Sequence, residues 1–336
     1  MRLEMDKKQI GKQRNSSIEL LRFFFIACVV IVHAYGFGVD KYPDQIFELG
    51  HSVKSFYHLS IYCICQVEVT GFMFISGFYG IKTKKERIIE LILMTLFYEA
   101  IIKFIFAPNI RFEDIRNLLH AFDLRWFVSC YIVICLIAPI IENGIQTINK
   151  KTFRNIIIGF LLYVYGAHLI GLSNDHDFIF LLTVYVTARY IRLNTPTFLY
   201  RYPKRLLLFS LLIVGGIPVL FSMSGVSHYP IMRIIATNNN ILLLVIASCL
   251  MIIFEKKHFY SSTINYMASS VLSIYLITSN ELISAPLNKL LFNLLQTPYG
   301  FLAIIAVCLL CIIIDKIRIQ IFKSILVLWK YYYSNR

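Results

Sequence analysis

Charged residues are scarce in this sequence. Only 15% of its 336 residues are Asp, Glu, Lys or Arg, whereas 58% are hydrophobic and the mean hydropathy is +0.67. A typical soluble domain has about 25% charged residues, so this shortage excludes a soluble enzyme, a disordered protein and a nucleic-acid binder. Acidic residues are the rarer class, with 19 Asp and Glu against 33 Lys and Arg. The composition indicates an integral membrane protein with a formal net charge of +14.

The sequence also lacks any cysteine spacing typical of a disulfide framework or a zinc site. All eight cysteines lie inside apolar runs. We therefore expect them to pack as small hydrophobic side chains, and we expect no metal ion.

Apolar runs of roughly 20 residues, the length that a helix needs to cross a bilayer, dominate the chain. The ten expected spans are Ile18–Phe37, His58–Gly80, Ile88–Ala107, Leu124–Ile141, Asn155–Leu172, Phe178–Ile191, Leu206–Met223, Ile241–Phe254, Ile264–Ile283 and Tyr299–Ile314. This pattern predicts an all-α polytopic membrane protein. Its bundle is expected over residues 18–314, between a basic N-terminus (1–17) and a basic tail (315–336). The first run contains Arg22 and lacks a small-residue cleavage site, so we expect it to be retained as a helix. Arg111–Phe122 is expected to be an interfacial helix.

The basic residues give an independent test of this count, because short cytoplasmic loops carry an excess of Lys and Arg. If the N-terminus is cytoplasmic, 24 of the 33 basic residues fall in the cytoplasmic segments and 7 in the outer segments. The remaining two, Arg22 and Lys103, lie within spans; Arg125 and Arg189, near the ends of expected spans, are counted with the adjoining outer and cytoplasmic segments. We therefore expect both termini in the cytoplasm.

The first expected span contains an arginine and a histidine, and ionisable side chains in a membrane are candidate functional groups because they are costly there. His33 follows Arg22 by eleven positions, which places both within about 20° of one helix face and about 16.5 Å apart along it. Both should therefore face one cavity, with Arg22 nearer the cytoplasm. Glu19 lies one turn before Arg22 and can pair with it. The alternatives are a snorkelling Arg22 and a hydrogen-bonded packing role for His33.

Polar residues also occupy the middle of the second expected span, where Gln66, Glu68 and Thr70 give the helix a polar face. Glu68 is expected to be either a partner for a buried cation or a proton-handling group. Further along, Ser76 and Gly77 allow neighbouring helices to approach closely, and close packing is the simplest explanation for both.

A basic segment, Lys82–Arg87, follows this span on the expected inner side. Topology alone predicts basic residues at that place. Beside the mouth of a cavity, however, they can also hold a cytosolic polyphosphate, with Arg87 as a forked donor and Lys84 as a point charge.

The first span carries a resemblance to a known family. Asn15-Ser-Ser-Ile-Glu-Leu-Leu-Arg22, followed by ten residues and His33, resembles the signature of membrane-bound acyltransferase family 3. Three later elements are similar to that family in the same order: Phe74–Phe78 with its Ser-Gly, Arg125-Trp126-Phe127 with Pro139, and Ser273–Ile277 with its Tyr-Leu. The resemblance covers residues 15 to 280.

The family includes O-acetyltransferases of bacterial surface polysaccharides. The resemblance therefore implies a multi-pass enzyme of the bacterial plasma membrane, surrounded by lipid and with no nucleic-acid partner. It would move an acetyl group from cytosolic acetyl-CoA to a hydroxyl of a cell-surface or exported polysaccharide, or of a lipid-linked precursor. No metal is implied. His33 would act as the general base, Arg22 would position groups or stabilise charge, and Lys84 and Arg87 would hold phosphates.

Acyl transfer also needs hydrogen-bond donors for the developing oxyanion, and Arg22, Ser76 and Trp126 are equal candidates. Ser76 and Gly77 are further candidates for contact with the donor. Glu68 and Tyr275, the latter in the Tyr-Leu element, are candidates for substrate binding or support.

The chain departs from the family at two positions. Lys84 stands where relatives often have arginine, which keeps the charge but loses the fork. Thr278 stands where many relatives have a histidine, so that group has no counterpart here.

Two other classes remain as alternatives. A polysaccharide flippase or polymerase is the first, although the sequence lacks a large basic outer loop and a flippase does not require Arg22 aligned with His33. A solute transporter or a non-enzymatic scaffold is the second, and flux without consumption of acyl-CoA would identify a transporter. The chain shows no convincing internal repeat and no paired broken helices, which argues against the commonest transporter plans.

Overall fold

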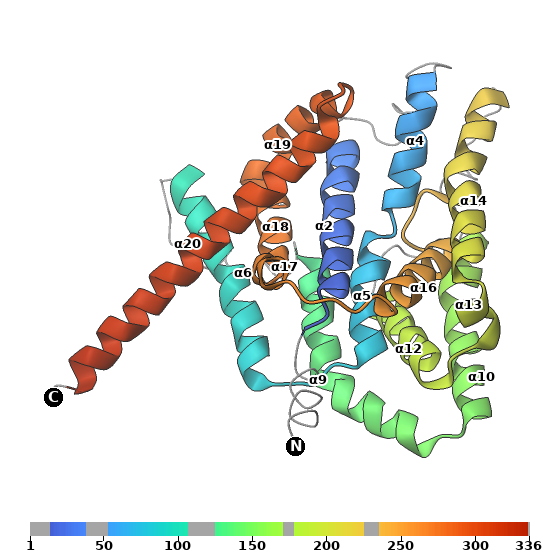
Figure 1. Cartoon of the computed structure of the whole chain (residues 1–336), viewed down its shortest axis with the longest axis horizontal. Helices are drawn as coiled ribbons and strands as arrows, with labels where there is room; N and C mark the ends of the chain where they lie inside the picture. The colour runs from blue at the N-terminus through green and yellow to red at the C-terminus, as the bar shows by residue number, and fades with distance from the viewer. Residues whose placement is uncertain (1–13, 38–52, 107–124, 171–177, 225–234, 335–336) are drawn as a thin grey trace.

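The structure is a computed structural model that describes residues 14–37, 53–106, 125–170, 178–224 and 235–334. Regular structure over these residues is helical, with no strand among them. The helices are α2 (Ser16–Phe37), α4 (Val53–Cys65), α5 (Glu68–Tyr79), α6 (Lys85–Phe106), α9 (Trp126–Thr147), α10 (Lys150–Leu161), the π-helix η1 (Leu162–Gly166), α11 (Ala167–Leu169), α12 (Phe178–Asn194), α13 (Thr197–Arg201), α14 (Pro203–Ser224), α16 (Ile241–Glu255), α17 (Ser262–Ala268), α18 (Val271–Thr278), α19 (Glu281–Leu295) and α20 (Gly300–Ser334). Figure 1 labels most of these helices along the chain.

Five of the ten expected spans are confirmed by the length and composition of their helices. They are Ser16–Phe37, Phe56–Tyr79, Trp126–Thr147, Pro203–Leu220 and Gly300–Ser324. Ile241–Glu255 is a shorter apolar helix. The full count of ten, like the orientation of the bundle, stays a prediction. The expected interfacial helix at Arg111–Phe122 lies outside the described residues.

The ninth expected span, Ile264–Ile283, is wrong as a continuous helix. The structure divides it among α17, α18 and the start of α19. The last division has a clear cause, because Asn280 caps a new helix by accepting a hydrogen bond from the backbone N–H of Leu282 at 3.0 Å. Ser270 stands at the other division, before α18. Apolar composition indicated a helix here, but it did not reveal these breaks.

The second expected span is also interrupted, at Gln66 and Val67 between α4 and α5. The chain turns there through hydrogen bonds from the Gln66 N–H to the Tyr62 carbonyl at 3.2 Å and from the Val67 N–H to the Ile64 carbonyl at 3.3 Å. Because α5 then begins at Glu68, this carboxyl side chain lies in the first turn of a helix that starts inside the span.

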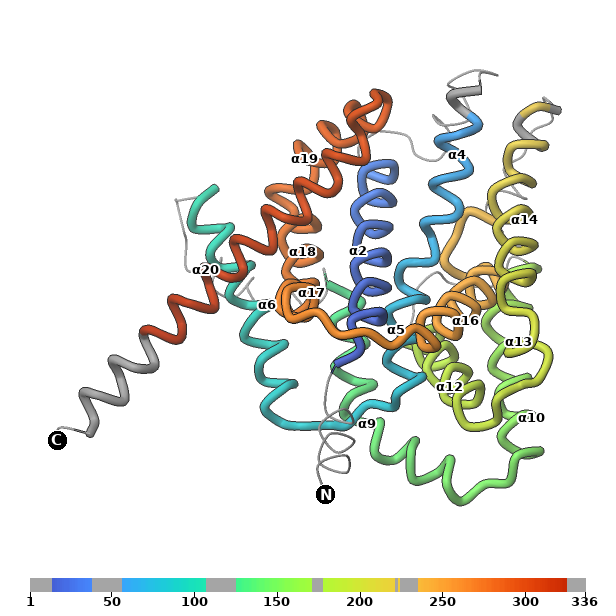
Figure 2. The backbone as a smooth tube through the Cα atoms, in the orientation of Figure 1, coloured from blue at the N-terminus to red at the C-terminus, as the bar shows by residue number. Residues whose placement is uncertain are grey.

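Helix α2 lies in the middle of the bundle, with α4 and α5 on one side of it and α18 and α19 on the other (Figure 1). Its Leu21, Val30 and Ala34 side chains are completely buried. The backbone trace in Figure 2 shows the same arrangement, with α17 and α16 passing the N-terminal end of α2. Helix α2 is therefore held by contacts with helices on both of these sides.

Helix α20 continues without a break past Ile314, so the segment expected as a tail begins as further turns of this helix. Asp315 in this part is fully buried and accepts hydrogen bonds from Tyr98 Oη and Arg318 Nε, both at 2.7 Å. In Figure 1 the C-terminal end of α20 and the N-terminal end of α2 both point to the lower side of the view.

Candidate active site

A cavity of about 660 Å³ lies among α2, α5, α6, α9 and α18. Four cations, Arg14, Lys82, Lys84 and Arg87, line one end of it, which we call the basic end. The lining reaches Phe37 at the other end of α2. The cavity therefore follows α2 over most of the length of that helix.

Eight of the ten site residues predicted from the sequence line this cavity. They are Arg22, His33, Glu68, Ser76, Lys84, Arg87, Trp126 and Tyr275. They come from α2, α5, α9, α18 and the basic segment, so the fold brings together positions far apart in the sequence. The other two, Glu19 and Gly77, support the site from behind its walls.

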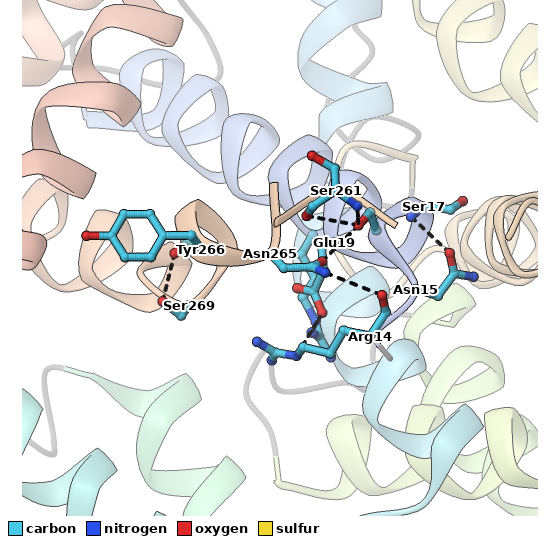
Figure 3. Close-up of polar contacts among 10 residues, drawn as sticks. Arg14, Asn15, Ser17, Glu19, Ser261, Asn265, Tyr266 and Ser269 are labelled. Atoms are coloured by element: carbon cyan, nitrogen blue, oxygen red, sulfur yellow. Dashed lines mark hydrogen bonds and ion pairs between the residues drawn. The ribbon is translucent and has the colours of Figure 1, made fainter. Parts of the chain in front are cut away.

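Glu19 holds two cations at the basic end. Its side chain is only 4% exposed, and its Oε1 accepts a hydrogen bond from Arg22 Nη1 at 2.7 Å. Arg14 Nε lies 3.4 Å from the same oxygen, and Figure 3 shows the Arg14 side chain beside Glu19. The expected pairing of Glu19 with Arg22 is confirmed. Since the Arg22 guanidinium turns back toward Glu19, it turns away from His33, which lies further along α2 in the other direction.

Polar bonds at its first turn fix the position of α2. Asn15 caps the helix by accepting from the Ser17 N–H at 3.1 Å (Figure 3). Ser17 Oγ donates to the Phe254 carbonyl at 2.7 Å, and Ser16 Oγ accepts from the Ser261 N–H at 2.8 Å. These bonds join α2 to the segments around α16 and α17, and so they set the faces on which Arg22 and His33 lie.

His33 lines the cavity with an unsatisfied ring nitrogen. Its Nδ1 is buried and has no hydrogen-bond partner among the described residues. The Phe37 and Tyr275 rings lie near it, with centroids 5.4 Å and 6.3 Å from the imidazole. Buried polar atoms normally find a partner, so an unsatisfied nitrogen on a cavity wall points to a bound ligand as that partner. The alternative of His33 as a hydrogen-bonded packing residue finds no support at this atom.

Aromatic rings form one wall of the cavity around Phe127. Its ring centroid lies 6.1 Å from both Trp126 and Tyr131, 6.4 Å from Tyr275 and 6.5 Å from Phe72. This wall joins α5, α9 and α18 and gives the middle of the cavity a largely apolar surface. An acyl chain or pantetheine arm suits such a surface better than a free ion does.

A network that the sequence did not predict holds the loop leading into the basic segment. Glu142 accepts hydrogen bonds from Arg189 Nε and Tyr185 Oη, both at 2.8 Å, and Tyr185 Oη accepts from the Ile81 N–H at 3.2 Å. Gly80 has a positive φ of 73°, and a Cβ at this position would lie 3.1 Å from Arg189 Cζ and 3.3 Å from Glu142 Oε1. We call Glu142, Tyr185 and Arg189 the inner clamp.

The basic segment itself remains open to solvent. Lys82, Lys84 and Arg87 are exposed, line the basic end of the cavity and form no ion pair with any residue that the structure describes. Thr83 between them donates to the Cys135 carbonyl at 2.5 Å, which ties the segment to α9. The arrangement presents cations on an anchored backbone, as a polyphosphate site requires.

Ser76 and Gly77 differ in placement. Ser76 lines the cavity, and its Oγ donates to the Phe72 carbonyl of its own helix at 3.2 Å. Gly77 faces α12, where an added Cβ would lie 2.4 Å from the Tyr185 carbonyl oxygen. Close packing therefore accounts for Gly77, and its expected contact with a donor stays without structural support.

Arg125 belongs to a buried polar network that the sequence did not predict. It is 3% exposed, donates to the carbonyl and hydroxyl of Ser279, and lies 3.3 Å from Glu99 Oε2. Asn280 Nδ2 donates to the same carboxylate oxygen at 3.0 Å. Because Arg125 directly precedes Trp126, this network fixes the start of α9 at the cavity wall. Glu99 in an apolar helix was the signal that a buried cation should be sought.

Thr278 occupies the position where many relatives have a histidine. It is 1% exposed, donates to the Ile274 carbonyl at 2.8 Å and does not line the cavity. Tyr275, one turn earlier, is the residue of this helix that faces His33. His33 is therefore the one histidine among the residues that line the cavity.

One comparison with known proteins gives a match. The model of one protein family, described as an acyltransferase domain, matches residues 15–316. This range includes all ten predicted site residues. No curated protein and no solved structure matches the chain.

Proposed function

Given that the chain belongs to the acyltransferase domain family, we propose that this membrane acyltransferase is an O-acetyltransferase. It takes an acetyl group from cytosolic acetyl-CoA and transfers it to a hydroxyl of a cell-surface or exported polysaccharide, or of its lipid-linked precursor. We place it in a bacterial plasma membrane with both termini in the cytoplasm.

One observation carries this proposal: a single cavity contains both an open cluster of cations and a half-buried histidine whose Nδ1 is buried and unsatisfied. The cations suit the phosphates of a coenzyme, and the histidine suits the proton transfer that acylation of a hydroxyl requires. A flippase needs a path for its substrate, but it does not need these two features in one cavity.

The donor enters from the basic end. Lys84 and Arg87 hold its phosphates, and the inner clamp keeps the loop that leads to them in place. The pantetheine arm then extends along the aromatic wall toward His33. Since basic loops face the cytoplasm, this entry is on the side where acyl-CoA is made.

His33 acts as the general base at the other end of that arm. It removes the proton from the acceptor hydroxyl while the hydroxyl oxygen attacks the thioester carbonyl. The new C–O bond forms, the C–S bond breaks, and the proton passes from His33 to the departing thiolate. Atoms and charge balance without a metal or a redox partner.

Arg22 serves the donor rather than the reacting carbonyl. It lies about 16.5 Å below His33 along the helix, because eleven residues rise by that amount, and its guanidinium points back to Glu19. A side chain in this position reaches the phosphates or the arm of the donor. The oxyanion then requires other donors, and Trp126, which lines the cavity and carries an indole N–H donor, suits this role better than Arg22.

The test is transfer by the purified protein in lipid vesicles, with labelled acetyl-CoA and a crude extract of glycans and lipid-linked sugars. We expect label to move into a base-labile ester of the extract, and we expect acetyl-CoA to compete better than a long-chain acyl-CoA. If no acyl-CoA of any chain length is consumed while lipid-linked sugar crosses the vesicle membrane, the flippase alternative is correct and this proposal is wrong.

A further inference from the structure

We propose that Gln66, Glu68 and Asn238 form a subsite that binds hydroxyl groups of a sugar acceptor inside the membrane bundle. This inference rests on the proposed function and identifies where its second substrate sits. All three residues line the cavity that also contains His33.

The break between α4 and α5 creates the subsite. An uninterrupted helix would bond every backbone group internally, whereas the turn at Gln66 and Val67 introduces irregular backbone in the middle of a span. Such backbone is tolerated at that depth where it is buried in protein or lines a cavity. The second segment in the subsite contains Asn238 and leads into α16 (Ile241–Glu255). Helix α16 packs against α5.

Two oxygen atoms of the subsite have no partner in the protein. Glu68 is only 4% exposed, and its Oε2 accepts no hydrogen bond from any described residue. The Oδ1 of Asn238 is likewise buried without a donor. A buried polar atom without a partner costs free energy, so two of them on residues that line one cavity indicate that a ligand supplies the missing bonds.

The chemistry of these atoms selects the ligand. Both are hydrogen-bond acceptors, so the ligand must bring donors. A phosphate offers chiefly acceptors and would be repelled by a carboxylate, and a hydrocarbon chain has no polar atom to offer. The pantetheine arm has amide N–H and hydroxyl donors, but its proposed path follows the aromatic wall around Phe127. A sugar presents several hydroxyl donors at once. The subsite therefore suits the polyhydroxyl acceptor, while the phosphates of the donor remain at the basic end.

Asn288 provides a matched control. This α19 residue is 1% exposed, and both polar atoms of its amide lack partners among the described residues, yet it does not line the cavity. Its replacement removes the same kind of unsatisfied buried atom as a substitution in the subsite does. Any effect common to both positions reflects the stability of the bundle, and an effect at Glu68 alone reflects the acceptor.

The test is acetyl transfer from labelled acetyl-CoA to glucose, N-acetylglucosamine and octyl β-glucoside by wild type, Glu68→Leu, Glu68→Gln and Asn288→Leu in lipid vesicles. A lost hydrogen bond to a charged group lowers binding by about 10- to 100-fold. We expect Glu68→Leu to lower kcat/KM for the accepted sugar by about this factor. Glu68→Gln, which keeps one acceptor oxygen, should lose less. Binding of labelled acetyl-CoA should stay at the wild-type level in all variants.

Three results would overturn the subsite. These are an unchanged sugar kcat/KM in Glu68→Leu, an equal loss in Asn288→Leu, and consumption of acetyl-CoA by wild type with no transfer to any of the three sugars. If wild type neither binds nor consumes acetyl-CoA, the proposed function itself fails, and that result is distinguished by the donor-binding measurement.

Discussion

Replacing Arg22 with alanine should separate its structural role from its role in catalysis, provided that Glu19 is changed as well. The carboxylate of Glu19 is 4% exposed, and its Oε2 has no partner among the described residues. Removing Arg22 therefore leaves a buried charge that keeps only Arg14, 3.4 Å away and half exposed. Breaking a fully buried pair costs about 3–5 kcal/mol. Because the Arg22 side chain is 30% exposed and Arg14 remains, we expect about 1–3 kcal/mol.

Adding Glu19→Gln to Arg22→Ala removes the uncompensated charge. We expect the double variant to recover most of the lost stability and to lie within about 1 kcal/mol of wild type, as coupled neighbours commonly do. The free energy of unfolding can be measured by titration with a denaturing detergent in mixed micelles. Acetyl transfer should stay low in the double variant, because the donor has lost a cation.

Two outcomes would refute this reasoning. If the double variant is no more stable than Arg22→Ala, the buried charge of Glu19 is not what Arg22 compensates. If the double variant regains both stability and transfer activity, Arg22 is purely structural and the donor does not use it.

Three further predictions concern the basic end and the packing behind it. Lys84→Ala should raise the KM for acetyl-CoA by about tenfold, as expected for the loss of one charge-assisted hydrogen bond. Lys85→Ala should leave this KM unchanged, because Lys85 lies in the same exposed segment but outside the cavity lining. An equal rise of the KM in both variants would indicate only a diffuse charge effect. Gly77→Ala should destabilise the bundle by about 1–3 kcal/mol through overpacking, because the new Cβ would lie 2.4 Å from the α12 backbone. Gly144→Ala is the control, because a Cβ there has no neighbour within 4 Å. Equal melting temperatures of the two variants would contradict this packing. Glu142→Gln should weaken acetyl-CoA binding several-fold at normal protein abundance, because the inner clamp loses its negative charge but keeps its shape. Isothermal titration with acetyl-CoA measures this affinity. A wild-type affinity in Glu142→Gln would show that the inner clamp does not position the basic segment.

The helices of this protein could largely be predicted from hydropathy, because a membrane permits few other structures. The prediction of α2 was nearly complete: the expected span began at Ile18, and the helix begins at Ser16. Helical periodicity also placed Arg22 and His33 correctly on one cavity. Both results depend only on local sequence and on the geometry of a single helix.

The breaks in helices and the long-range pairs could not be predicted in the same way. Asn280 follows the C-cap of one helix and caps the next, but an asparagine in an apolar run does not reveal which neighbour it caps. Arg125 was counted as an outer cation, although it pairs with Glu99, 26 residues away, inside the protein. Such pairs depend on how helices pack, and a single sequence carries no direct signal of that packing.

The central claim is that His33 performs acyl transfer in the cavity, and His33→Ala tests it most directly. Since Nδ1 has no partner among the described residues, its removal should leave abundance and thermal stability near wild type. The measurement is transfer of labelled acetyl from acetyl-CoA to the glycan extract, at equal amounts of folded protein and with acetyl-CoA binding measured in parallel. We expect donor binding to persist and transfer to fall by at least about 100-fold, the lower end of the effect of a general base. Full transfer by His33→Ala would contradict the account.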